Sequence, residues 1–159
     1  MNMRVSSEAF DHGDRIPVEY SQDGDNLSPP LEIEGVPEGA EEIVLLAYDP
    51  DAPTPHPWVH WLVYGIPPGV RSLPEGIRVS PRPERPPGAR QGLNTSGDAG
   101  YEGPAPPVGD GVHELHFKAY ALDQTLDLEP GADPQTVLEV MLDHVIDYGE
   151  LVGTFERRS

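Results

Sequence analysis

The sequence of 159 residues contains no cysteine and a single lysine, Lys118. Without cysteine, a disulfide framework, a thiolate nucleophile and a zinc site with sulfur ligands are excluded. Ten basic residues stand against 28 acidic ones, which gives a formal net charge of −18. Nucleic acids and anionic membranes attract proteins through lysine and arginine, so a chain of this charge is repelled by both. We therefore expect neither nucleic acid nor membrane insertion.

Long apolar runs are also missing. No run approaches the roughly 18 apolar residues that a membrane span needs. The segment Met1–Phe10 contains Arg4 and Glu8 and lacks the apolar stretch of a signal peptide, which predicts a cytoplasmic protein. A large number of acidic residues together with almost no lysine is typical of proteins that work in concentrated salt. There the Debye length falls to about 3 Å at about 1 M, which removes most self-repulsion, so we expect a halophilic source.

Proline and glycine, by contrast, are abundant, with 20 and 17 residues. Both interrupt helices, which excludes a helical bundle or a coiled coil. Short apolar segments with the pattern of β-strands cover residues 43–48, 58–66, 113–123 and 150–157. We expect a mostly β (β-rich α+β) fold, a β-sandwich, in a single domain over residues 1–159.

One helix is predicted over residues 134–148. Asp133 followed by Pro134 is typical of a helix N-terminus, an apolar stripe of helical period follows, and Gly149 supplies the end. Residues 11–40 carry loop signals. Residues 67–111 form a long Pro- and Gly-rich stretch, in which we expect a few short strands and functional residues.

Five acidic and histidine residues stand near these strands: Asp49, Asp51, His56, His60 and His113. His56 and His60 have the spacing of a zinc-binding helix, but Pro57 between them makes a helix implausible. In an extended strand four residues span about 13 Å, too far for one zinc ion to bridge. We therefore expect no metal site.

The two aspartates and the strand histidines allow several interpretations. Asp49 and Asp51 suit acid–base chemistry on a sugar, an Asx-turn, or the orientation of His60 or His113. Each histidine is either a core residue bound to a backbone carbonyl or part of a shared pocket mouth. Strict alternation places Trp58 on the face of His60, and Val59 and Trp61 on the other face. A mouth with two imidazoles and an indole wall suits a small anion on an organic stem.

The glycine-rich segment 97–103 lacks the following Lys-Ser/Thr of a phosphate-binding P-loop, although backbone N–H groups near Gly103 suit an anion nest. No G-x-S-x-G motif is present, so a serine hydrolase has no local support.

Four motifs in order resemble the phosphatidylethanolamine-binding protein family. The match is closest to its short bacterial and archaeal members, the Raf kinase inhibitor-like proteins. The motifs are DPDAP at 49–53, WVHW at 58–61, GYEGPAPP at 100–107 and GVH at 111–113. Asn26–Leu31 and Glu150–Phe155 also look like that group, so the resemblance covers nearly the whole chain.

The resemblance implies a β-sandwich with a non-catalytic pocket at one end, without a cofactor, that takes phosphate, acetate or a phosphorylethanolamine head group. The implied pocket residues are Asp49, Asp51, Trp58, His60, Gly103, Pro107 and His113. Ala52–Pro53 is the candidate for a cis peptide at its rim. Three departures predict a weaker, altered or vestigial anion site. The family's H-R-Y reads His113-Glu114-Leu115, and Ala105 stands where Cys or Ser is frequent.

Three functions follow as hypotheses. The first is a non-enzymatic binding module for a small anion or a phosphorylated head group. The alternative is a regulatory inhibitor of a kinase or protease, acting through protein contacts of the 67–111 region. The third is a hydrolase that uses the Asp/His cluster. By analogy with small members of such families, we also expect a homodimer.

Overall fold

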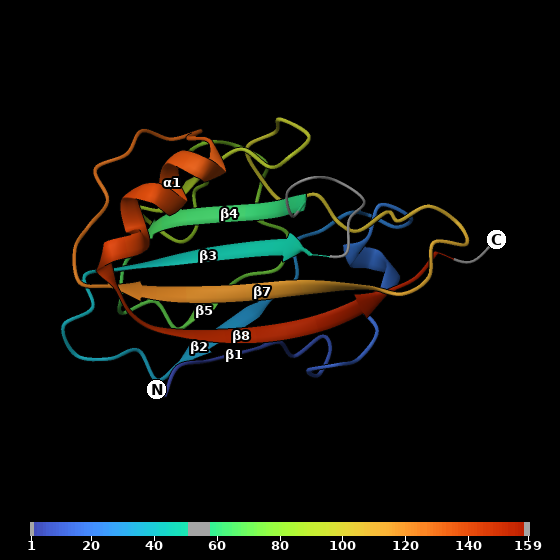
Figure 1. Ribbon diagram of the computed structural model, residues 1–159, viewed down its shortest axis with the longest axis horizontal. Coiled ribbons are helices and arrows are strands. Elements are labelled where there is room, and N and C mark those ends of the chain that lie inside the picture. The colour runs from blue at the N-terminus through green and yellow to red at the C-terminus, as the bar shows by residue number, and fades with distance from the viewer. Residues whose placement is uncertain (1, 51–57, 158–159) are drawn as a thin grey trace.

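The computed structural model describes residues 2–50 and 58–157, and its strands form two antiparallel sheets (Figure 1). In spatial order, the smaller sheet comprises β1 (Arg4–Ser6), β2 (Leu31–Glu34) and β5 (Ser72–Leu73). The larger sheet comprises β6 (Arg90–Gln91), β4 (Trp58–Ile66), β3 (Glu42–Asp49), β7 (His113–Leu122) and β8 (Val145–Phe155). The helices are α1 (Pro134–Met141) and the short 3₁₀ turns η1 (Val18–Tyr20) and η2 (Leu142–His144). The predicted mostly β fold is confirmed.

Two apolar layers hold these elements together. The first lies between the sheets, where Ile33 of the smaller sheet shares a cluster with Trp61 and Phe117 of the larger one. The second lies between the other face of the larger sheet and α1, where Leu62 packs with Val137. The helix covers this outer face in Figure 1. β3 contributes to both layers, as expected for a short strand made almost entirely of apolar residues.

The helix begins as predicted but ends earlier. The side chain of Asp133 accepts a hydrogen bond from Gln135 N, which caps the first turn. α1 ends at Met141, and β8 begins at Val145, so the prediction of a helix to residue 148 is wrong. The reason is tertiary, because β8 pairs with β7 from its first residue onward. Gly149 lies within the strand. A Cβ there would stand 2.7 Å from Met3 O, so this glycine lets the N-terminal chain cross.

Strands also occur in two regions for which the sequence did not predict the position of any strand. The short strands expected within residues 67–111 are present as β5 and β6. Residues 11–40, predicted as loop, contain β2, whose Leu31 and Ile33 are buried and whose Glu32 and Glu34 are exposed. No helix within the described residues is long and apolar enough to cross a membrane.

Candidate functional site

One edge of the larger sheet collects residues from three strands. β3 runs antiparallel to both β4 and β7, so the end of β3 lies beside the beginnings of the other two. Asp49 is the last residue of β3, Trp58 the first of β4 and His113 the first of β7. Asp49 pairs in register with Trp58. The topology therefore brings three of the predicted site residues to one edge.

The imidazole of His113 lies between two carboxylates. Its Nδ1 is 2.6 Å from Oδ2 of Asp49, and its Nε2 is 2.5 Å from Oδ2 of Asp110. A carboxylate accepts hydrogen bonds, so both contacts are hydrogen bonds together when the ring is an imidazolium, which donates from each nitrogen. Burial alone lowers the pKa of His113. The hydrogen bonds to both aspartates, together with their charges, outweigh that effect and leave the pKa above its ordinary 6.5. Of the two histidines that the sequence offered as partners of an aspartate, His113 is the one that contacts Asp49.

His60 has a different partner. Its Nδ1 lies 2.6 Å from the carbonyl oxygen of Glu102, and Glu102 N donates to the carbonyl of His60 at 2.9 Å. Burial lowers the pKa of His60, and the carbonyl bond and the charges of Asp49 and Glu102 oppose this only in part. The charge of His113 also lowers it, so the two imidazoles interact electrostatically. His60 is thus a neutral ring that donates through Nδ1, which leaves the lone pair on Nε2.

A β-bulge places His60. Between β3 and β4 the register shifts, so that Trp61 pairs with Ala47 and Val59 pairs with Tyr48, and His60 is the additional residue. Trp61 packs between the two sheets, whereas Val59 packs on the side of α1. The prediction that Val59 and Trp61 share a face is therefore wrong, because strict alternation fails across a bulge. Beyond the bulge, Trp58 lies on the face of its partner Asp49.

Gly103 and Pro107 lie on the segment that leads to His113. Gly103 N donates to Oδ1 of Asn26 at 2.6 Å, so this N–H is not available to a ligand in the present arrangement. A Cβ on Gly103 would stand 2.3 Å from Tyr20 O, which explains why glycine is needed there. Pro107 is exposed, and its carbonyl accepts the N–H of Asp110 at 3.0 Å. The hydrogen bond between Asp110 N and the carbonyl of Pro107 forms a turn that directs Asp110 back toward His113.

Some predictions fall on residues that the structure does not describe. Asp51, His56 and the Ala52–Pro53 bond lie outside the described residues. Within the described part of the chain, no group of three or more His, Asp or Glu side chains is arranged to hold a metal ion.

Sequence reasoning missed three residues of the site: Asn26, Glu102 and Asp110. Asp110 lies between two glycines and three residues before a strand histidine, whereas Asn26 and Glu102 lie within segments that carry the family resemblance. Glu102 and Asn26 contribute a backbone carbonyl and a side-chain acceptor across long sequence separations. Pattern alone does not reveal such contacts.

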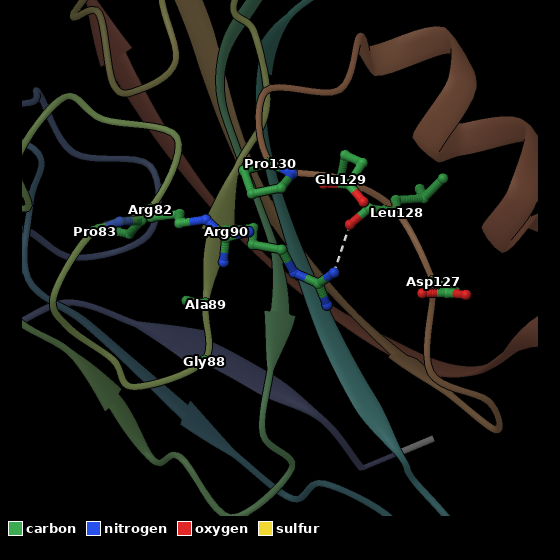
Figure 2. Close-up of a pocket in the computed structure, with 9 residues that line it drawn as sticks. All are labelled: Arg82, Pro83, Gly88, Ala89, Arg90, Asp127, Leu128, Glu129 and Pro130. Atoms are coloured by element: carbon green, nitrogen blue, oxygen red, sulfur yellow. Dashed lines mark hydrogen bonds between the residues drawn. The ribbon is translucent and has the colours of Figure 1, made fainter.

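A separate cavity of about 370 Å³ lies at the other end of β4 (Figure 2). Arg90, the β6 partner of Tyr64, donates to Leu128 O at 2.5 Å, and its guanidinium lies 5.5 Å from the Tyr64 ring centroid. This arginine ties the 126–130 loop to the sheet. Its cavity is distinct from the edge where the two histidines lie.

A two-sheet sandwich with histidines and an aspartate at one edge defines a ligand-binding type of fold, and comparison with known proteins agrees. Residues 6–156 match the family model described as phosphatidylethanolamine-binding protein. The chain belongs to the phosphatidylethanolamine-binding protein family.

Individual relatives support this assignment along nearly the whole chain. The UPF0098 protein PH1269 of Pyrococcus horikoshii is 45% identical over 158 residues, which covers 99% of this chain and 78% of that protein. The crystal structure of Escherichia coli YbcL, described as a member of the mammalian PEBP family, has a TM-score of 0.93 at 32% identity, covering 99% and 100% of the two chains. The PEBP homolog CT736 of Chlamydia trachomatis has a TM-score of 0.86 at 42% identity, covering 98% and 97%.

Proposed function

We propose that this protein binds a small anion of the phosphate or phosphate-monoester class, without converting it, at the sheet edge formed by Asp49, Trp58, His60 and His113. The observation that carries the proposal is the bond between Asp49 and Nδ1 of His113. This bond fixes the ring and favours its charged form, so that Nε2 is a charged donor turned away from Asp49. Asp51, Gly103 and Pro107 belong to the proposed site through the family resemblance.

The two histidines have complementary properties. The imidazolium of His113 donates to an anion, and the neutral ring of His60 offers an acceptor for a protonated ligand oxygen. The indole of Trp58, which lies on the Asp49 face, supplies an apolar wall for an organic stem. A phosphate monoester has a charge and an organic stem, and below its second pKa of about 6 it also has a protonated oxygen.

The affinity is expected to be modest. A dissociation constant of about 1 mM corresponds to about −4.1 kcal/mol, which is reasonable for one charged donor and a few polar contacts. The net charge of −18 opposes entry of an anion, and added salt reduces that penalty.

Calorimetric titration with inorganic phosphate and with O-phosphorylethanolamine tests the proposal. We expect binding by the wild type and its loss in His113→Ala and in His113→Gln, which keeps more of the side-chain volume. His144→Ala is the matched control, because His144 also pairs with a carboxylate, that of Asp123 at 3.0 Å, at the other end of β7. Equal heats for the wild type and both His113 variants would overturn the site. Release of inorganic phosphate from O-phosphorylethanolamine, abolished in His60→Ala, would instead support the hydrolase.

A protein contact is the second candidate function, and one observation favours it. Arg78, Arg82 and Arg85 are exposed on a proline-rich segment, in a chain that is otherwise strongly acidic. Inhibition of a kinase or a protease through this segment would need no ligand. It would persist in His113→Ala and would be lost when the three arginines are changed to serine.

We also infer that the protein works in concentrated salt. The support is its composition, with 28 acidic residues against ten basic ones and a single lysine. Screening then stabilises the folded chain as well as anion binding at the site.

A further inference from the structure

Asp110 lies where an anion bound to His113 would have to lie. Its Oδ2 is 2.5 Å from Nε2 of His113, while Nδ1 of the same ring is bonded to Asp49. Nε2 is therefore the nitrogen left for a ligand, and a carboxylate of the chain itself already accepts its hydrogen bond. We propose that Asp110 is a tethered internal ligand, which an incoming anion must displace before it binds His113. This inference rests on the proposed function.

The contact has the features of a displaceable one. The side chain of Asp110 is 38% exposed, whereas that of His113 is 7% exposed. Val108 and Val112, near it in sequence, are both more than half exposed, so few apolar contacts hold this turn. The fixed partner of His113 is Asp49, which lies at the end of a buried strand.

The backbone on either side of Asp110 is suited to movement. Gly109 and Gly111 have φ values of 84° and 85°, in the left-handed region that glycine adopts at little cost. A Cβ on either glycine would have no other atom within 4 Å, so open space surrounds the turn. Asp110 thus sits between two flexible residues and can leave His113 while β7 stays in place.

The charges around His113 explain why an internal ligand would form here. Among the described residues, the titratable groups that act on the site are Asp49 and Asp110 at the ring, and His60, which is bonded to Glu102. Without Asp110 and without a bound anion, Nε2 of His113 would have no negatively charged partner. The carboxylate of Asp110 provides that partner when no external anion is bound. An external anion replaces this contact only by competing with a group three residues along the chain.

Competition from Asp110 reduces the apparent affinity for an external anion. The affinity is multiplied by the fraction of time for which Nε2 of His113 is free of Asp110. If Asp110 holds His113 about nine-tenths of the time, removal of its charge raises the affinity about tenfold. Because the same fraction applies to every anion that binds Nε2 of His113, the affinities for phosphate and for acetate should rise by a similar factor. A general change in surface charge would not produce this common factor, since it acts more strongly on phosphate.

The test is calorimetric titration of the full chain with inorganic phosphate and with acetate. We expect Asp110→Asn and Asp110→Ala to bind both anions about tenfold more tightly than the wild type. The control is Asp143→Asn, which makes the same charge change at an exposed position of η2, near the end of β7 remote from His113. It should leave both affinities unchanged.

The outcomes separate this inference from the function on which it rests. Equal affinities of the wild type and the Asp110 variants, with binding lost in His113→Gln, would overturn the internal ligand and leave the anion site standing. A gain confined to phosphate, or one matched by Asp143→Asn, would also overturn it. Binding of neither anion by any of these variants would overturn the proposed function itself.

Discussion

His60 and His113 lie on the two strands that flank β3, and they are almost equally buried, at 5% and 6% exposure. Their pKa values nevertheless move in opposite directions from 6.5. His60 is bonded to a neutral carbonyl, so burial prevails and lowers its pKa. His113 is bonded to two carboxylates, which reverse the effect of burial. Both the bonding partner and the stronger effect of burial on His60 therefore separate the two rings, and the carboxylate partners favour the charged form of His113.

In the proposed site, this difference would give the two histidines different roles. A charged donor together with a neutral acceptor would recognise a partly protonated anion better than two identical rings. The charge of His113 disfavours a second charge on His60, and the lowered pKa of His60 reduces this repulsion.

The largest expected effect is on stability. His113→Ala removes the cation from the buried carboxylate of Asp49 and should lower the free energy of unfolding by about 3 kcal/mol, as expected when one partner of a buried pair is lost. His60→Ala, which removes a donor from the carbonyl of Glu102, should cost about 1–2 kcal/mol. Urea denaturation near neutral pH measures both.

His144→Ala provides the reference for this comparison. His144 also pairs with a carboxylate, but its side chain is 30% exposed and that of Asp123 is 51% exposed, so the loss should stay below about 1 kcal/mol. A loss in His113→Ala no greater than that in His144→Ala would contradict the buried pair.

The second effect is opposite pH dependence of the two histidines. Because the folded pKa of His113 is raised, its contribution to stability is fully present below 6.5 and is lost as the pH rises through the folded value. Because the folded pKa of His60 is lowered, its contribution is present above 6.5 and is lost as the pH falls to the folded value.

The free energies of unfolding of the wild type, His60→Gln and His113→Gln at about pH 5 and about pH 8 test this contrast. The destabilisation by His113→Gln should be larger at the lower pH, and that by His60→Gln larger at the higher pH. The difference is on the order of 1 kcal/mol for each unit of pKa shift. Slopes of the same sign for both variants would show that the two rings share one charge state.

The strands that carry His60 and His113 show how much of this molecule could be predicted from the sequence. The strand over Trp58–Ile66 was predicted with its observed bounds, and that of β7 within one residue, because apolar patterns there agree with burial. The family resemblance assigned Asp49, Trp58 and His113 to one pocket, and in the structure the antiparallel pairing of β3 with β4 and β7 brings them to one edge.

What the sequence did not predict depends on contacts between distant residues. The bulge at His60 arises from a register shift against β3, which alternation along β4 cannot show. The early end of α1 follows from the pairing of Val145 with Leu122. The contact of Asp110 with His113 needs the turn after Pro107, so proximity in sequence did not suffice to identify it.

The smallest effect separates the local pair from the charge of the whole chain. Repulsion among 28 acidic residues acts over several ångströms of water and is screened by salt, whereas the bond of His113 to Asp49 is a direct contact between buried groups that salt reaches poorly. From about 0.1 M to about 3 M KCl, we expect wild type and His113→Gln alike to gain at least about 1 kcal/mol, or about 3 °C in Tm. Their difference should change by less than about 0.5 kcal/mol. An unchanged wild-type Tm would refute the adaptation to salt. A difference that disappears at high salt would place the His113 pair among exposed ion pairs, because only such pairs lose their contribution to screening.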